Sequence, residues 1–175
     1  MDIIGTIKRT GKKAEQILTG FEPAADEIDI LDTLKEEHDE VKVLLERLVE
    51  SSSGKERKSL LSKIKTALVP HVRAEEKVLY DAIIALKDKQ SKQDGEEGYL
   101  EHTLADRMLA NLSKIGNPMS PEFSAAAKVL KELVAHHIDE EEKNVWSDAR
   151  ENFSAEQRGE MNRRFVAAKK RVRIP

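Results

Sequence analysis

The sequence predicts an all-α fold: an up-down-up-down antiparallel four-helix bundle with an N-terminal arm and an extra C-terminal helix. Three observations lead to this prediction. Apolar residues recur in steps of three and four along four long stretches, Gly and Pro are scarce, and no alternating strand pattern competes. Charged residues make up 36% of the 175 residues, which suits the outward faces of such helices. We therefore expect one helical domain with a substantial core.

The expected elements follow one another with short breaks. Residues 1–25 are expected to form the arm, residues 26–152 the bundle, and residues 153–175 a C-terminal helix packed on it. The bundle helices are expected at roughly 26–50, 55–88, 96–115 and 121–151, with a loop at 89–95. Ser120-Pro121 and the pair Ser154 and Gln157 have the residue types of helix starts.

The composition excludes several classes of site. The chain has no cysteine, so disulfides, thiolate metal sites and cysteine nucleophiles are excluded. A net charge of -3 argues against a nucleic-acid binder that uses its whole surface, and the basic stretch 163–173 is expected to be a cationic helix end facing water. No stretch is apolar for long enough to span a bilayer, so we expect a cytoplasmic location.

Polar side chains interrupt the apolar stripe of the second helix. His71 and Glu75 lie four residues apart, which places them one above the other on the face that otherwise carries core residues. Pro70 precedes them and removes a backbone donor, so a kink is expected at this point. The stripe predicts that an imidazole and a carboxylate are buried together.

The same arrangement occurs twice along the chain. In each half a lone histidine on one helix is followed on the next by His-x-x-x-Glu, with a second acid after the Glu and an aromatic nine residues after the motif His. These residues are His38, His71, Glu75, Glu76 and Tyr80, and then His102, His137, Glu141, Glu142 and Trp146. His136 and Glu140 offer an alternative pair on an adjacent stripe. We prefer His137 and Glu141 because they keep the aromatic at the same offset.

A metal centre explains this pattern. The inward stripes carry no Lys or Arg, and two carboxylates buried without a cation would each strongly destabilise the core. Six nitrogen and oxygen donors without sulfur suit iron, manganese or zinc, and they are too many for one tetrahedral zinc ion. We expect two ions bridged by the carboxylates, an oxo-bridged di-iron centre first, with manganese or zinc possible. Asp106, four residues after His102, is a candidate seventh ligand or an acceptor for an imidazole N–H.

These motifs resemble the hemerythrin-like, or HHE cation-binding, family over roughly residues 28–150. The resemblance rests on the phrases LDTLKEEHDEVKVLLERL, HVRAEEKVLY, EHTLADRML and HHIDEEEKNVW. It implies a hemerythrin-like bundle in which two irons are ligated by His38, His71, Glu75, His102, His137 and Glu141, with the two glutamates bridging. The oxygen-carrying hemerythrins of invertebrates have a second histidine where this chain has Asp106, and His-x-x-x-x-Asp on the fourth helix. Anionic ligands stabilise ferric iron, so the departures favour redox reactivity or sensing over reversible oxygen carriage.

The sequence therefore predicts a non-haem di-iron protein that binds or senses O2, NO or peroxide, or handles iron, in the cytosol. One alternative is a redox enzyme with weak peroxidase, catalase or ferroxidase activity at the same centre; another is a helical interaction module that the metal only stabilises. No general base is evident outside the ligands, which argues against a dedicated enzyme. The expected partner is a small diatomic or peroxide ligand, with no nucleic acid and no membrane, and the oligomeric state stays open.

Overall fold

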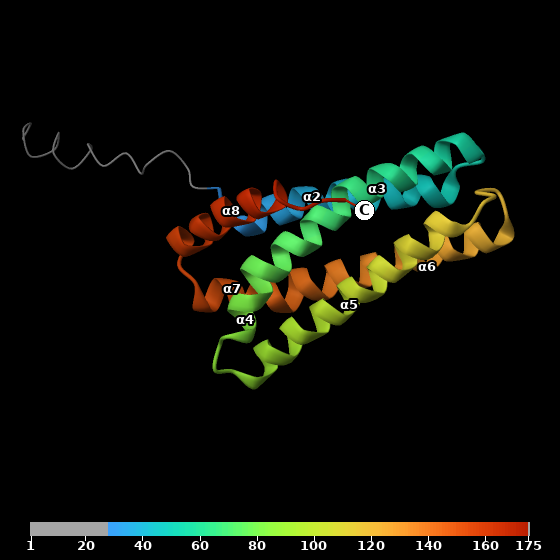
Figure 1. Ribbon diagram of the computed structural model, residues 1–175. Coiled ribbons are helices and arrows are strands. Elements are labelled where there is room, and N and C mark those ends of the chain that lie inside the picture. Colours follow the sequence, from blue (N-terminus) through green and yellow to red (C-terminus); the bar gives the residue numbers. More distant parts are fainter. Residues whose placement is uncertain (1–27, 175) are drawn as a thin grey trace, which may run out of the picture.

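The computed structural model describes residues 28–174, and the regular secondary structure of this part is all helical, with no strand (Figure 1). Its helices are α2 (Ile30–Glu50), α3 (Gly54–Glu75), α4 (Asp81–Ile84), α5 (Lys89–Lys114), α6 (Pro121–Glu140), α7 (Trp146–Asn152) and α8 (Ala155–Lys169). Two π-helical turns, η2 (Glu76–Tyr80) and η3 (Glu141–Val145), join α3 to α4 and α6 to α7. The predicted all-α class is confirmed. The expected arm at residues 1–25 lies outside the described residues.

The long helices pack around a shared interior. α2 lies against α3 and α6, and α5 lies against α6 and α3, so every long helix has two neighbours in this set (Figure 1). α8 packs on α2 and α3, on the outside of this group. Within residues 28–174 no helix combines the length and the hydropathy that crossing a membrane requires.

Side-chain caps begin the helices where the sequence indicates them. The Ser120 hydroxyl accepts a hydrogen bond from the Phe123 amide, and Ser154 and Gln157 form a reciprocal capping box at the start of α8. The loop expected at residues 89–95 was wrong, because α5 already begins at Lys89. Its cap is Asp88, whose carboxylate accepts from the Ser91 amide.

Pro70 lies inside α3, and the helix continues through it to Glu75. The change from α-helical to π-helical hydrogen bonding comes later, in η2, directly after Glu75. The second half has the matching turn, η3, beginning at Glu141. Single π-helical turns inside α-helices occur frequently at functional sites, and here each one adjoins a candidate bridging glutamate.

The core consists of two apolar clusters with polar side chains between them along the helices. On α2, Leu34 belongs to one cluster and Val41 to the other, and the buried His38 lies between them. On α3, Leu68 and Val72 belong to the same cluster as Val41, whereas Ala74 belongs to the cluster of Leu34. The six polar side chains considered below are buried in this middle part of the bundle.

Candidate metal centre

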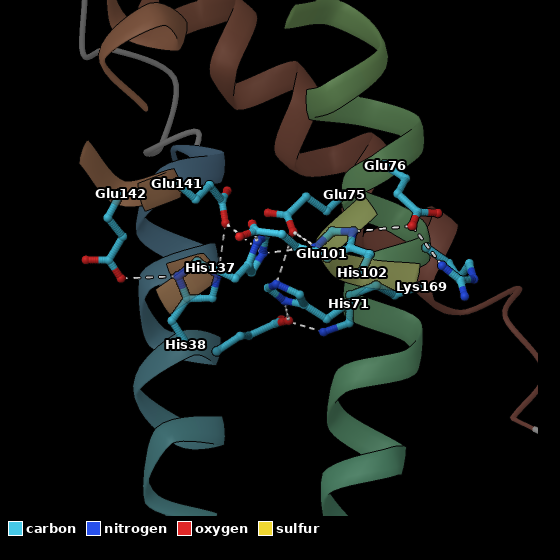
Figure 2. Close-up of polar contacts among 12 residues, drawn as sticks. His38, His71, Glu75, Glu76, Glu101, His102, His137, Glu141, Glu142 and Lys169 are labelled. Carbon is cyan, nitrogen blue, oxygen red and sulfur yellow. Dashed lines mark hydrogen bonds and ion pairs between the residues drawn. The ribbon is translucent and has the colours of Figure 1, made fainter. Parts of the chain in front are cut away.

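Four helices and one π-helical turn bring six polar side chains into the interior. α2 supplies His38, α3 supplies His71 and Glu75, α5 supplies His102, α6 supplies His137 and η3 supplies Glu141 (Figure 2). None of the six residues exposes more than 7% of its surface. Residues far apart in the sequence therefore meet at one buried point.

Glu75 lies at the middle of this cluster. Its Oε2 atom is 3.3 Å from His71 Nε2 and 3.5 Å from His102 Nε2. Glu75 belongs to two groups of three residues whose potential ligand atoms lie within 4.8 Å of one another. One group is His38, His71 and Glu75, and the other is Glu75, His102 and His137. A carboxylate common to two donor groups has the position of a bridge between two cations.

Glu141 lies against the other ring nitrogens. Its Oε2 atom is 3.4 Å from His38 Nε2 and 3.7 Å from His137 Nε2, so it too faces one histidine from each half. Its Oε1 atom accepts a hydrogen bond of 2.9 Å from the indole N–H of Trp146, whose ring stacks on His38. The two glutamates thus occupy corresponding positions between the halves.

Each histidine makes an outer contact with a further carboxylate, through Nδ1. The Nδ1–oxygen distances are 3.2 Å for His38 and Glu142, 2.9 Å for His71 and Glu37, 3.2 Å for His102 and Glu76, and 2.7 Å for His137 and Glu101. An ionised carboxylate only accepts, so Nδ1 donates and the Nε2 atom of all four rings faces the interior. Carboxylates behind metal-bound imidazoles usually have this role.

These four outer contacts form a closed ring around the bundle. A glutamate of α2 holds the α3 histidine, one of η2 holds the α5 histidine, one of α5 holds the α6 histidine, and one of η3 holds the α2 histidine. The sequence indicated Glu76 and Glu142 only as acids that follow each motif. It also held a signal for Glu37 and Glu101 that was missed: each directly precedes a lone histidine.

The outer glutamates are in turn paired with bases nearer the surface. Lys169 lies 2.5 Å from Glu37, Arg73 lies 2.8 Å from Glu76, and Lys35 lies 3.5 Å from Glu142. His136 Nε2 lies 3.7 Å from Glu101. Each outer glutamate therefore lies between an imidazole on its inner side and a basic side chain on its outer side.

Several atoms of the interior have no hydrogen-bond partner among the described residues. They are His38 Nε2, both carboxylate oxygens of Glu75 and Glu141 Oε2. His102 Nε2 and His137 Nε2 are 3.0 Å apart, with a lone pair on each when both Nδ1 atoms donate. If one ion bound both nitrogens, with bonds of about 2.1 Å at a right angle to each other, the two nitrogens would be separated by about this distance. Unsatisfied buried acceptors are costly, so the donor set fits cations and little else.

The protonation states point the same way. Burial, and then the charge of Glu75, raises the pKa of Glu141 well above its usual range. Burial alone would lower the pKa of His71, but the carboxylates of Glu75 and Glu37 raise it to about 9. Without metal, protons therefore occupy the positions that a cation would take, and metal binding would release them.

The choice between the two neighbouring histidines of α6 follows from their burial. His137 points into the cluster, whereas the side chain of His136 is 62% exposed and reaches only Glu101. Asp106 does not reach the cluster. Its carboxylate pairs with Arg73, and the acceptor for the His102 ring N–H is Glu76. The structure thus brings together six of the seven predicted ligand residues and gives Asp106 a different contact.

α8 covers the first half of the centre. The ring of Phe165 meets the ring of His71 edge-on, with centroids 5.8 Å apart. Lys169, also on α8, reaches Glu37 behind the same imidazole. The C-terminal helix therefore belongs to the surroundings of the site as well as to the core.

Comparison with known proteins identifies the family of the chain. The profile of the hemerythrin HHE cation binding domain matches residues 29–146. A curated relative, a DNA nickase of Nostoc sp. (strain PCC 7120), is 26% identical over 98% of this chain, and the chain spans only 53% of that relative's length. No solved structure matches. The matched residues contain all six buried donors and the four outer glutamates, and the chain belongs to the hemerythrin HHE cation-binding family.

Proposed function

We propose that the chain binds two metal ions, iron in the first place, and that these ions meet a small ligand such as O2, NO or peroxide. The proposed ligands are His38, His71, Glu75, His102, His137 and Glu141. The observation that carries the proposal is the set of inward carboxylate oxygens and the His38 Nε2 atom without hydrogen-bond partners, together with the ring nitrogens of His102 and His137 that face each other. The up-down-up-down antiparallel arrangement of a hemerythrin-like bundle belongs to the same proposal, and the neighbour relations of α2, α3, α5 and α6 support it.

The protein contributes the donors and their orientation. Each ion would take two imidazoles and share the two carboxylates, which leaves positions for an external ligand on an ion that prefers more than four donors. When bound, iron would supply Lewis-acid and redox chemistry. The Nδ1 contacts hold every Nε2 lone pair inward, and burial of the cluster excludes bulk water.

The test is metal content with a matched pair of variants. The apo protein is loaded with ferrous iron under nitrogen, exposed to air, and examined by elemental analysis and visible spectroscopy. We expect two irons per chain and charge-transfer bands in the wild type and in His136→Ala. His137→Ala, one residue away, is expected to lose at least one iron. Equal metal content in the two variants, or none in the wild type, contradicts the proposal.

A second candidate function is DNA cleavage. The relative named DNA nickase matches nearly the whole chain, and the described part has a local basic face. That face is a groove of about 490 Å³ along the end of α3, η2 and α8, lined by Arg73, Lys77, Arg164 and Arg171. The net charge argues against a whole-surface binder and not against such a local contact. Because the six donors are buried, a DNA phosphate would not reach the ions, and cleavage by this centre would need a small diffusible product.

Relaxation of supercoiled plasmid by the iron-loaded protein tests this candidate. We expect strand cleavage to be lost in His137→Ala and reduced severalfold in the double variant Arg164→Ala/Arg171→Ala. The double variant Lys55→Ala/Lys58→Ala removes the same charge from the other end of α3 and is the control. Cleavage that persists in His137→Ala with chelator present would show that this centre is not its source.

A further inference from the structure

The phenol of Tyr80 is buried beside the centre with its hydroxyl unused. The residue has 0% exposure, and its hydroxyl has no hydrogen-bond partner among residues 28–174. A phenol is neutral at neutral pH, so its O–H is a hydrogen-bond donor. A buried donor without an acceptor destabilises the fold, so its retention calls for an acceptor that residues 28–174 do not supply.

The corresponding aromatic of the other half has its donor satisfied. Trp146 stands at the same offset from its motif histidine, and its indole N–H donates to Glu141 at 2.9 Å. Tyr80 instead packs edge-on against His102, with ring centroids 5.4 Å apart, and leaves its O–H open. The two ends of the centre therefore differ: of the two aromatic residues, Tyr80 has an unpaired hydrogen-bond donor among the described residues, whereas the donor of Trp146 is paired.

α5 is shaped to hold the phenol in this place. A Cβ atom added to Gly98 would lie 2.5 Å from Tyr80 Cζ and 2.8 Å from its hydroxyl oxygen. These distances are far below van der Waals contact, so any side chain at position 98 would displace the ring. Gly98 thus gives the phenol its space, and the hydroxyl has little freedom to turn elsewhere.

A narrow cleft of about 20 Å³ adjoins Tyr80, between α5, the end of α6 and η3. Its inner wall contains Tyr80, Gly98, His137 and Glu141. This volume is enough for one water-sized molecule. A larger cavity of about 290 Å³ lies on the opposite side, lined by Glu37 and His71 but by neither bridging glutamate. Of these two spaces, the cleft at Tyr80 is therefore the one that adjoins a candidate bridging glutamate, Glu141.

We infer that the Tyr80 hydroxyl donates a hydrogen bond to a small anion or diatomic ligand bound at the His102–His137 end of the centre. The inference rests on the proposed metal centre and adds to it the end at which the ligand binds and the residue that recognises it. The donor and the small cleft together set the ligand class: a small molecule or anion with an acceptor atom that faces the phenol. Tyr80 is in this sense a ligand-binding residue.

The experiment is an azide titration of the iron-loaded ferric protein, followed by visible absorption. Tyr80→Phe keeps the ring and removes the donor, and Tyr99→Phe is the matched control at the other tyrosine of the chain. The Tyr99 hydroxyl lies 2.8 Å from the Asp81 carboxylate and 3.0 Å from the Glu76 carbonyl oxygen, outside the cluster. We expect Tyr80→Phe to weaken azide binding about tenfold or more, as loss of a hydrogen bond to a charged acceptor does, and Tyr99→Phe to change it less than about twofold.

Iron content, measured first, separates the two proposals. A wild type without iron overturns both the centre and the role of Tyr80. Equal iron and equal azide affinity in Tyr80→Phe and wild type overturn the role of Tyr80 and leave the centre standing, and a loaded wild type that binds no azide does the same. Gly98→Ala gives an independent readout, because crowding of the phenol and the cleft is expected to weaken azide at unchanged iron content.

Discussion

At the scale of single residues, the carboxylates behind the imidazoles decide how well the site is prepared for metal. Each holds a histidine of the neighbouring helix with its Nε2 atom facing inward. A ring that lacks this contact is free to turn or to take the other tautomer. The cost of losing one such partner is typically tenfold to a hundredfold in metal affinity.

Glu101→Ala is therefore expected to weaken iron binding by about tenfold to a hundredfold. Its carboxylate is the 2.7 Å partner of His137 Nδ1. Competition with a chelating dye measures the change. Glu96→Ala, at an exposed position of the same helix, is the control and is expected to bind iron as the wild type does. An iron affinity of Glu101→Ala within twofold of the wild-type value would contradict the proposed role of the outer glutamates.

The raised pKa of His71 predicts how the stability of the metal-free protein depends on pH. The folded-state pKa is about 9 against 6.5 for the unfolded chain, because Glu75 and Glu37 favour the protonated ring. The stabilisation is complete below pH 6.5 and is lost as the pH rises through 9, by roughly 3 kcal/mol at most. Urea unfolding in the presence of chelator should show this loss, and His71→Gln should flatten it. If the stability of His71→Gln fell with pH as steeply as that of the wild type, the pH dependence would belong to another group.

At the scale of helices, the sequence predicted the long elements better than their joints. Apolar periodicity and the Ser120 and Ser154 caps placed the helices, because both signals are local. The π-helical turns were not predictable, since a change of hydrogen-bond spacing over five residues leaves no trace in the apolar pattern. The start of α5 was missed because its first two turns contain no apolar side chain, although Ser91 and Gly95 are buried, and only the Asp88 cap marks it.

α8 is expected to contribute to the stability of the whole domain. Phe165 is fully buried and its ring packs on His71, so Phe165→Ala should lower the free energy of unfolding by about 3–5 kcal/mol. The neighbouring Val166 is 38% exposed, and Val166→Ala serves as control with an effect of roughly 0.5 kcal/mol. Chemical denaturation of both variants measures this. Similar losses for the two variants would mean that α8 is only loosely docked.

At the scale of the molecule, metal binding and folding are coupled through the buried cluster. Iron that binds the folded chain only should stabilise it by about 2.7 kcal/mol at a free concentration of one hundred times Kd. Glu75→Gln removes the carboxylate that both donor groups share, so its stability should not respond to iron. Urea midpoints with iron and with chelator give both values. A full iron response in Glu75→Gln would exclude Glu75 as a bridge.

The candidate site was predictable to the extent that it repeats. His38, His71, Glu75, His102, His137 and Glu141 break apolar stripes, and a break of that kind is visible in a single sequence. Asp106 was misjudged because helical spacing places it near His102 but does not reveal its partner Arg73 on α3. Glu37 and Glu101 were overlooked because an acid on a charged helix surface is ordinary. Their role depends on which helix lies next to which.

The ring of glutamate–histidine contacts has a consequence for the ancestry of the fold. Two of its contacts, Glu37 with His71 and Glu101 with His137, lie within one half of the chain, and the other two join the halves. Glu76 holds His102 just as Glu142 holds His38. Two copies of the first half, related by a two-fold axis, would therefore complete every contact of the ring, each copy lending Glu76 to the His38 of the other. A half-length homodimer is a sufficient precursor, and duplication with fusion would yield the present chain without a change of ligands.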